Sequence, residues 1–177
     1  MPTTTLTTPR IRLEPFNDTH FEGLFKLNSD PQVMRYITGK PDTRDDTVAM
    51  LERNKARWIE SGFSWWSFIE LKTHEMIGAG YIQHLERNPA NPIEIGWRLR
   101  QDKWQQGFAS EAAQRMAAFA FEEIGTDLLY AVCHQENNSS AQVMKKLGMH
   151  YRGIETWYEM EMFVYTMTAS NWKTRTM

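Results

Sequence analysis

The sequence has little of several features that would assign it to a narrow class. A single cysteine, Cys133, in 177 residues excludes an internal disulfide and fits a reducing cytoplasm. The net charge of −2 leaves no basic excess, so we expect no nucleic-acid partner. No apolar run approaches the length that spans a bilayer, and the Thr-rich segment 1–8 lacks the apolar centre of a signal peptide. We therefore expect a cytoplasmic protein without a membrane partner.

Metal ligands and nucleotide fingerprints are also missing from the sequence. The five histidines are scattered and lack the spacing of a zinc site, so we expect no metal. Gly78-Ala-Gly80 matches no dinucleotide fingerprint, because no Gly-x-x-Gly helix start follows it. Tryptophan and methionine are abundant instead, with 7 and 11 residues. This excess fits an apolar groove or a homodimer interface as well as a core.

The length and the apolar patterns predict one domain. We place it at residues 9–172, between a flexible tail at 1–8 and a short C-terminal tail at 173–177. Strands are expected over 10–14, 65–71, 76–85, 93–99, 128–133, 149–154 and 159–167. Helices are expected over 18–29, 43–61, 109–124 and 137–147. The order predicts an α/β (α+β) fold, a mixed, mostly antiparallel sheet of about seven strands flanked by about four helices.

Local signals fix some of these elements more firmly. Thr43 followed by Asp46 resembles a capping box, with Asp in place of the usual Glu, and Gly62 ends the helix that it opens. This helix carries the apolar residues Val48, Leu51, Trp58 and Ile59. The adjacent Trp65 and Trp66 point to opposite sides of a strand, so we expect one in the core and the other in a groove or an interface.

The segment from Glu94 to Glu111 carries the strongest functional signal. An apolar strand leads into a polar turn, and Gly107 then opens a long amphipathic helix. Backbone N–H groups at a helix start have no internal partners, and the helix dipole adds partial positive charge there. Gly107 lets a ligand approach the backbone closely, and Ala109 and Ser110 keep the first turn uncrowded. This arrangement predicts a phosphate site.

Three motifs in the proper order resemble the GNAT superfamily of acetyl-CoA-dependent N-acetyltransferases, specifically its ribosomal-protein N-terminal acetyltransferase branch. The first is Glu94-Ile-Gly-Trp97 followed by Trp104-Gln-Gln-Gly-Phe-Ala-Ser-Glu-Ala112. The second is Asn137-Asn-Ser-Ser140 continuing to Lys146-Leu-Gly-Met149. The third is the entry Arg10-Ile-Arg-Leu-Glu-Pro15 with Asp30-Pro-Gln-Val33. The resemblance covers about residues 9–172.

The resemblance implies acetyl-CoA as co-substrate and a sheet splayed where it binds. The turn and helix start would hold the pyrophosphate, the backbone of residues 97–99 would pair with the pantetheine arm, and Asn137 would reach the arm from the other side. Ser140 would contact the thiol and donate a hydrogen bond to it as it leaves. The cofactor-binding residues expected on this basis are Trp97, Arg98, Leu99, Gln105, Gln106, Gly107, Phe108, Ala109, Ser110, Asn137 and Ser140.

The sequence also departs from the family pattern. Trp104 replaces the usual Arg or Gln of the loop, as is frequent in this branch, and Met149 replaces a Phe. The tyrosine that many relatives use as general acid would fall at Met144. The candidate bases are Glu94, at the strand that leads to the splay, and Glu159 as a second choice. Either carboxylate would need burial or a water relay to act as a base.

Three functions stay open on the sequence alone. The first is transfer of acetyl to a protein N-terminal amine by direct attack in a ternary complex. An α-amino group costs roughly 0.5 kcal/mol to deprotonate near pH 7.4, whereas a lysine amine costs roughly 4 kcal/mol. The second is acetylation of a small amine such as a polyamine, amino acid or aminoglycoside. The third is a non-catalytic acyl-CoA-binding module, suggested by the methionine at position 144.

Overall fold

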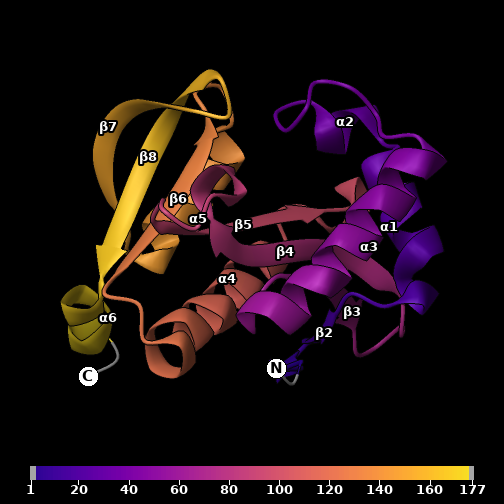
Figure 1. The fold of residues 1–177 in the computed structure, drawn as a ribbon, viewed down its shortest axis with the longest axis horizontal. Helices are drawn as coiled ribbons and strands as arrows, with labels where there is room; N and C mark the ends of the chain where they lie inside the picture. Colours follow the sequence, from indigo (N-terminus) through magenta and orange to yellow (C-terminus); the bar gives the residue numbers. More distant parts are fainter. Residues whose placement is uncertain (1–2, 176–177) are drawn as a thin grey trace.

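The computed structural model describes residues 3–175, which form a single eight-stranded sheet with helices on both sides (Figure 1). The strand order is β1-β2-β3-β4-β5-β6-β8-β7, and every pair is antiparallel except β5 with β6. The strands are β1 Leu6–Thr7, β2 Ile11–Pro15, β3 Trp65–Glu70, β4 Met76–His84, β5 Ile93–Leu99, β6 Leu128–His134, β7 His150–Trp157 and β8 Met160–Thr168. The expected mixed, mostly antiparallel sheet is confirmed, with one strand more than the sequence indicated.

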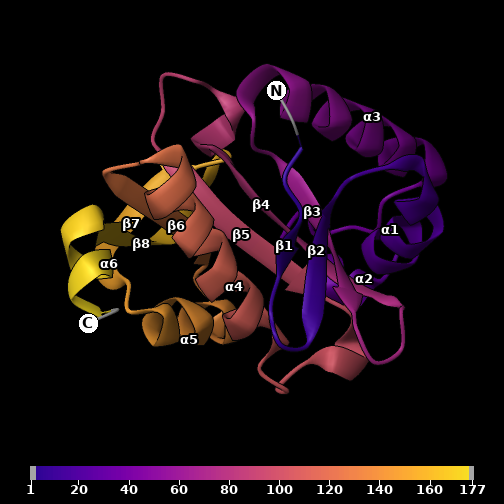
Figure 2. The same cartoon turned by 90° about the horizontal axis from the view of Figure 1, so that it is seen from below.

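The helices lie in two groups. In Figure 2, α1 and α3 lie on one side of the molecule and α4 and α5 on the other. The α-helices are α1 Phe21–Asn28, α2 Pro31–Met34, α3 Arg44–Ser61, α4 Phe108–Ala118, α5 Asn138–Leu147 and α6 Ala169–Arg175. Short 3₁₀ turns η1 Asp18–His20, η2 Leu85–Arg87 and η3 Gln101–Lys103 punctuate the chain, and the π-helical turn η4 Phe119–Ile124 extends α4.

Two apolar cores hold these layers together. The larger core lies between the sheet and helices α4 and α5, where Ala112, Ala113 and Met116 of α4 are fully buried. The small alanines let α4 approach the sheet closely. The smaller core lies beneath α1 and α3 and includes Leu24 and Leu51. The larger core includes Ile95 and Leu99 and so anchors β5, the strand on which the candidate site is built.

Strands β5 and β6 pair over a short stretch and then diverge. The parallel ladder between β5 and β6 has only the partners Ile93↔Leu129 and Glu94↔Tyr130. Beyond Glu94, β5 stays paired with β4 up to Leu99, while β6 stays paired with β8. The sheet is therefore splayed from Glu94 onward, as expected, and the edge of residues 95–99 that faces β6 is open.

The helix α3 begins at the expected capping box and ends at the expected glycine. Thr43 Oγ1 accepts from the Asp46 amide, the Asp46 side chain accepts from the Thr43 amide, and Gly62 closes the helix at φ +74°. The buried positions are Thr47, Met50, Leu51, Asn54 and Trp58. Of the apolar residues that the helix carries, Val48 and Ile59 are 47% and 68% exposed, and the polar Thr47 and Asn54 lie on the buried face instead.

The chain ends are more ordered than the sequence suggested. Leu6 is 1% exposed and lies in β1, which pairs with β2, and Thr4 accepts a hydrogen bond from the Trp66 indole. The expected flexible tail is therefore wrong for residues 4–8. Likewise α6 continues to Arg175, so residues 173–175 are helical, while positions 1–2 and 176–177 lie outside the described residues. Between residues 3 and 175 there is no helix with the length and apolar character needed to cross a bilayer.

Candidate active site

The turn between β5 and α4 is held in shape by side chains on both sides. The Trp104 indole donates to the Leu99 carbonyl at 2.9 Å, and Arg10 donates to the Gln106 carbonyl at 2.9 Å. Gln106 Nε2 donates back to the Asp102 carbonyl at 2.7 Å. The Trp104 ring therefore closes the turn, a role that suits the tryptophan found where the family usually has Arg or Gln.

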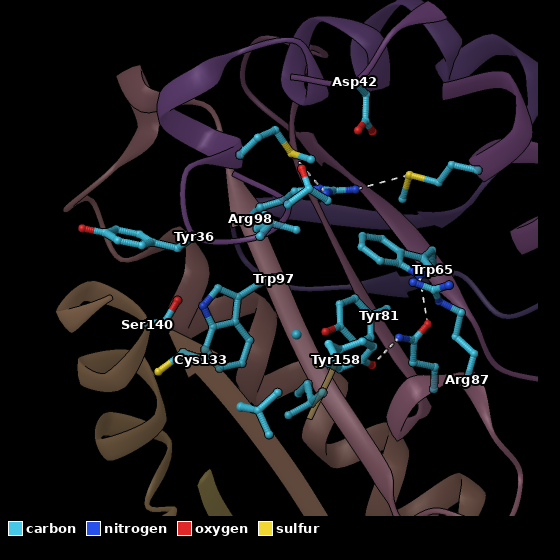
Figure 3. Close-up of a pocket in the computed structure, with 18 of the residues that line it drawn as sticks. Tyr36, Asp42, Trp65, Tyr81, Arg87, Trp97, Arg98, Cys133, Ser140 and Tyr158 are labelled. Carbon is cyan, nitrogen blue, oxygen red and sulfur yellow. Dashed lines mark hydrogen bonds between the residues drawn. The ribbon is translucent and has the colours of Figure 1, made fainter. Parts of the chain in front are cut away.

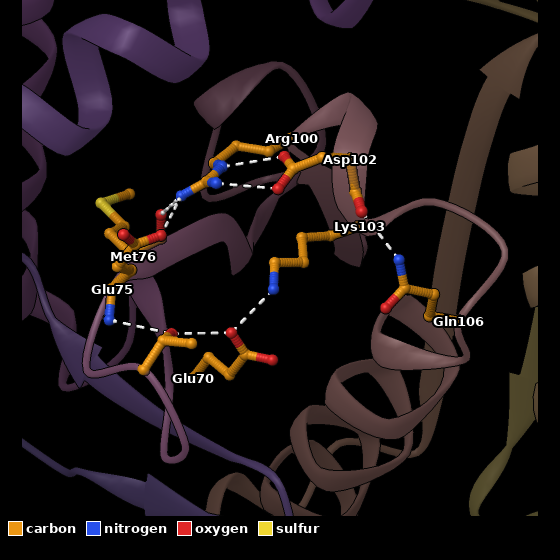
Figure 4. A network of polar contacts seen from close by, with 8 residues as sticks. Glu70, Glu75, Met76, Arg100, Asp102, Lys103 and Gln106 are labelled. Carbon is orange, nitrogen blue, oxygen red and sulfur yellow. Dashed lines mark hydrogen bonds and ion pairs between the residues drawn. The ribbon is translucent and has the colours of Figure 1, made fainter.

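An ion-pair network secures the first half of this turn (Figure 4). Arg100 pairs with Asp102 at 2.8 Å and with Glu75 at 2.9 Å, so it ties the turn to the start of β4. Lys103 pairs with Glu70 at 2.7 Å, and both side chains are largely buried. Exposed ion pairs add little stability singly, but several that share one turn restrict its conformation. The ion pairs therefore favour one conformation of the turn where it leads into α4.

The backbone of the turn leaves a row of free donors. Gln105 and Gly107 have φ angles of +58° and +84°, and Gly107 is the N-cap of α4. Within the described part of the chain, the amides of residues 105–110 donate to no protein acceptor, and the first helical bond is from Glu111 N to Gly107 O. Such a row of amides at a helix start suits an anion of the size of a pyrophosphate.

A cavity of about 620 Å³ opens over these amides. All of the expected cofactor-binding residues line it except Gln106, whose side chain is turned back to Asp102. Residues from three elements meet here: Trp97 to Leu99 of β5, the turn with the first residues of α4, and Asn137 with Ser140 at the start of α5. The structure therefore gathers around one cavity residues that the sequence places far apart.

A second cavity, of about 710 Å³, adjoins the first and also has Trp97 in its lining (Figure 3). It shares Trp97, Arg98, Asn137 and Ser140 with the first cavity, so the two meet at the splay. Trp65 lines this second cavity, whereas Trp66 is fully buried in the core, as expected for adjacent strand residues. We call the two spaces the loop cavity and the aromatic cavity.

Glu94 lies at the apex of the splay and is fully buried. Its Oε1 accepts from Gln83 Nε2 at 3.0 Å and from the Tyr158 hydroxyl, while its Oε2 has no partner among the described residues. Burial raises the pKa of Glu94 from 4.5 to about 7, and the hydrogen bonds from Gln83 and Tyr158 oppose the rise. A carboxyl with this pKa exchanges protons near neutrality, which suits acid–base chemistry.

Tyr158 links this buried carboxyl to the aromatic cavity. It lines the cavity, and its hydroxyl donates to Glu94 from a residue 64 positions later in the chain. Burial and the neighbouring Glu94 raise its pKa, so the phenol stays protonated at neutral pH. From the sequence, Tyr158 is a candidate for the wall of the substrate site but not for catalysis, because an aromatic residue near an expected hairpin is the only signal.

The second-choice base is not part of this arrangement. Glu159 is exposed in the β7–β8 turn, where it and Tyr158 have φ angles of +60° and +54°. It lines neither cavity. Glu159 therefore lies apart from Glu94 and from both cavities, because the turn directs its neighbour inward and leaves Glu159 in solvent.

The start of α5 completes the boundary between the cavities. Asn137 caps this helix, and its Oδ1 accepts from the Ser140 amide at 3.2 Å. The Ser140 side chain is half-buried and lines both cavities. Cys133 also lines the aromatic cavity, but burial raises its thiol pKa to about 11, so it is protonated and a poor nucleophile at neutral pH.

The chain resembles known acetyltransferases over most of its length. Residues 10–150 match the family model described as "Acetyltransferase (GNAT) domain". The uncharacterized N-acetyltransferase YnaD of Bacillus subtilis is 30% identical over 149 residues, which are 84% of each chain. FsC-acetyl coenzyme A-N(2)-transacetylase of Aspergillus fumigatus is 30% identical over 163 residues, 87% of this chain and 67% of that protein. RimL, a ribosomal L7/L12 α-N-protein acetyltransferase solved with coenzyme A, superposes with a TM-score of 0.78 at 14% identity, over 95% of this chain and 99% of that chain.

Proposed function

The chain belongs to the GNAT family and is an acetyl-CoA-dependent acetyltransferase, and we propose that its acceptor is the α-amino group of a protein N-terminus. The observation that carries the proposal is the position of Glu94 and Tyr158. Tyr158 lines the aromatic cavity and donates to Glu94, which is buried behind it, and this cavity meets the loop cavity at Trp97 and Ser140. The loop cavity then takes the cofactor, and the aromatic cavity takes the acceptor.

The loop cavity fits acetyl-CoA in three respects. The free amides of residues 105–110 suit the pyrophosphate. The open edge of β5 after Glu94 suits the peptide-like pantetheine arm, which needs backbone partners. An amide at the splay is also placed to polarise the thioester carbonyl as an oxyanion-hole donor. Charge-assisted hydrogen bonds are worth roughly 1.5–3 kcal/mol each, so a few supply much of a micromolar affinity of about 8 kcal/mol.

Proton removal from the acceptor follows the Tyr158–Glu94 hydrogen bond. The amine proton passes to the Tyr158 oxygen as the Tyr158 proton passes to Glu94, so the phenol is unchanged and Glu94 becomes neutral. The free amine attacks the thioester carbon, the C–S bond breaks, and the proton that the nitrogen loses as it becomes an amide neutralises the departing thiolate. Ser140, which lines both cavities, donates a hydrogen bond to the departing thiolate. Cys133 forms no acyl intermediate, because its thiol is protonated.

The pKa of Glu94 favours an α-amino acceptor over a lysine. A carboxyl with a pKa of about 7 nearly matches an α-amino group of about 7.7–8.0. A lysine amine, with a pKa of about 10.4, would leave roughly 4 kcal/mol of deprotonation cost near pH 7.4. The relay is therefore sufficient for an N-terminal amine.

A small-molecule amine is the second candidate acceptor. One observation in its favour is the similarity to FsC-acetyl coenzyme A-N(2)-transacetylase of Aspergillus fumigatus. The aromatic cavity, at about 710 Å³, also falls in the size range of small-ligand sites. The third candidate, a non-catalytic acyl-CoA-binding module, rested on Met144, and Tyr158 now supplies the acid–base group that position lacks.

Thiol release from acetyl-CoA tests the proposal. The purified chain is given peptides with a free N-terminus and a blocked lysine, peptides with the reverse arrangement, and a panel of small amines. We expect release only with free N-termini, and mass spectrometry should place the acetyl group on the α-nitrogen. Turnover confined to small amines would replace the proposed acceptor. Tight CoA binding without turnover on any amine would support the binding module.

A further inference from the structure

The aromatic cavity is cationic although the chain as a whole is not. The chain carries a net charge of −2. Basic residues in the cavity lining nevertheless outnumber acidic ones. The basic residues are Lys40, Arg53, Arg57, Arg87 and Arg98, and the acidic ones are Asp42 and Asp46. A cavity built for a polyamine would show the opposite balance, because its ligand would need carboxylates.

Arg98 is the most deeply placed of these cations. Its residue is 8% exposed, it points into the cavity beside Trp65 (Figure 3), and its guanidinium carbon lies 4.7 Å from the centre of that ring. Its terminal nitrogens lie near the sulfurs of Met34 and Met50, at 3.5 and 3.3 Å, and its Nε has no partner within residues 3–175. A buried guanidinium with only thioether acceptors lacks the anion that usually compensates its desolvation.

The other arginines approach the cavity from α3 and η2. Arg53 and Arg57 stand one turn apart on α3, and Arg87 comes from η2. Burial lowers the pKa of Arg53 and of Arg57, and repulsion from neighbouring arginines, Arg87 among them, lowers both further. In the described residues none of these three, nor Arg98, forms a salt bridge with a carboxylate.

Arg98 lines both cavities, but the cofactor does not explain the other three arginines. Arg53, Arg57 and Arg87 line only the aromatic cavity, whereas the free amides at the start of α4 line the loop cavity. Asp42 faces Arg98 without pairing with it, and burial raises the pKa of this carboxyl. The uncompensated positive charge therefore lies on the acceptor side of the splay.

We infer that the acceptor amine belongs to a molecule that also carries a carboxylate, which the arginines of the aromatic cavity bind while the amine lies at Tyr158. This inference rests on the proposed function and narrows its substrate. Arg98 follows Glu94 by four residues on β5, so their α-carbons are roughly 13 Å apart at about 3.3 Å per residue. That separation suits an acidic side chain within the first few residues of a peptide. A free amino dicarboxylic acid is the other source of the same chemistry.

Matched acceptors test the inference. N-terminal peptides with Asp or Glu at the second or third position are compared with the same peptides carrying Asn or Gln. A free amino dicarboxylic acid is compared with its amide, so that the two sources are separated. We expect kcat/KM to favour the acid at least about 10-fold, equivalent to about 1.4 kcal/mol, in one of the two arms. The preference should fall as salt is raised.

Arginine variants test whether the aromatic cavity is the source of the preference for acidic acceptors. Arg57→Gln with Arg87→Gln should reduce the acid preference to below about 3-fold, chiefly through KM, because one charge-assisted bond accounts for about 10-fold or more. Arg98→Lys keeps the charge but loses the planar donor array, so it should lower the preference while the chain still folds. Arg44→Gln is the matched control on α3: its side chain pairs with Glu22 outside both cavities and should leave the preference unchanged.

The possible results distinguish failure of the carboxylate inference from failure of the proposed function. Transfer to acidic and neutral acceptors at equal rates, or a preference that survives the double variant, would overturn the inference and leave the proposed function standing. No transfer to any peptide or amine, with acetyl-CoA bound, would overturn the proposed function itself. A preference for the acid that the arginine variants abolish and Arg44→Gln retains would establish the inference.

Discussion

Replacing Glu94 with glutamine should make the protein more stable at pH 8 and much less active. Burial raises the pKa of Glu94 from 4.5 to about 7, so the folded chain holds a proton there that the unfolded chain has released. Native-state stability therefore falls as pH rises between these two values, and above pH 7 the full cost is present. Glutamine never ionises and escapes this cost.

The size of the effect follows from the shift. At 1.36 kcal/mol per pKa unit, the shift from 4.5 to about 7 makes the cost of Glu94 grow by about 2–3 kcal/mol between pH 5 and pH 8. Between these pH values, Glu94→Gln should thus gain about 2–3 kcal/mol of unfolding free energy relative to the parent. At roughly 2–4 °C per kcal/mol for a chain of this size, Tm should rise by about 5–10 °C. Any loss of stability from an unpaired glutamine amide at the position of Oε2 is the same at both pH values. It therefore does not affect the difference between pH 5 and pH 8.

Urea unfolding at pH 5 and pH 8, followed by tryptophan fluorescence, measures the effect. Glu52→Gln, which changes a carboxylate that is 62% exposed on α3, is the control and should show no such pH-dependent gain. In the same preparations kcat should fall by about 100-fold or more, the usual contribution of a positioned acid–base group. A Glu94→Gln chain whose stability follows pH as the parent's does would refute a carboxyl with a raised pKa at this position.

Three further predictions address the relay, the loop and the chain start. Tyr158→Phe removes the hydroxyl that donates to Glu94. In a pH–rate profile the rise in kcat/KM should therefore move to higher pH, while the affinity for acetyl-CoA stays unchanged. An unaltered profile would exclude the relay. Gly107→Glu should abolish CoA binding in calorimetry while the chain still folds, because Gly107 has φ +84° and the carboxylate would occupy the phosphate position; full affinity would refute the cradle. Leu6→Ala should cost about 2–5 kcal/mol in urea unfolding, because Leu6 is 1% exposed, whereas a loss under about 0.5 kcal/mol would mean that β1 is dispensable.

Features set by nearby residues could be predicted from the sequence. The capping box of Thr43 and Asp46 and the glycine at the start of α4 act within one turn, so their chemistry is visible in a short window. The splay was an expectation from family resemblance rather than from spacing. It is borne out by the two-residue ladder between β5 and β6.

Features that depend on distant contacts could not be predicted in the same way. Nothing near Tyr158 in the sequence shows that its hydroxyl meets Glu94, because the β7–β8 turn decides which of Tyr158 and Glu159 points inward. Strand β1 is ordered because the Leu6 side chain packs into a core formed by residues later in the chain. The charge of the aromatic cavity is equally hidden, since its arginines come from α3, η2 and β5.

The 64-residue separation of Glu94 and Tyr158 has a consequence for the order in which the enzyme becomes competent. Every amide of the phosphate cradle lies before residue 111, but the phenol arrives only with the C-terminal hairpin. Under the proposed relay, a chain without that hairpin would lack the group that takes the acceptor's proton, and β6 would lose β8 as its partner along Leu128–His134. The proposed chemistry therefore needs the last two strands, which are synthesised after the whole cradle.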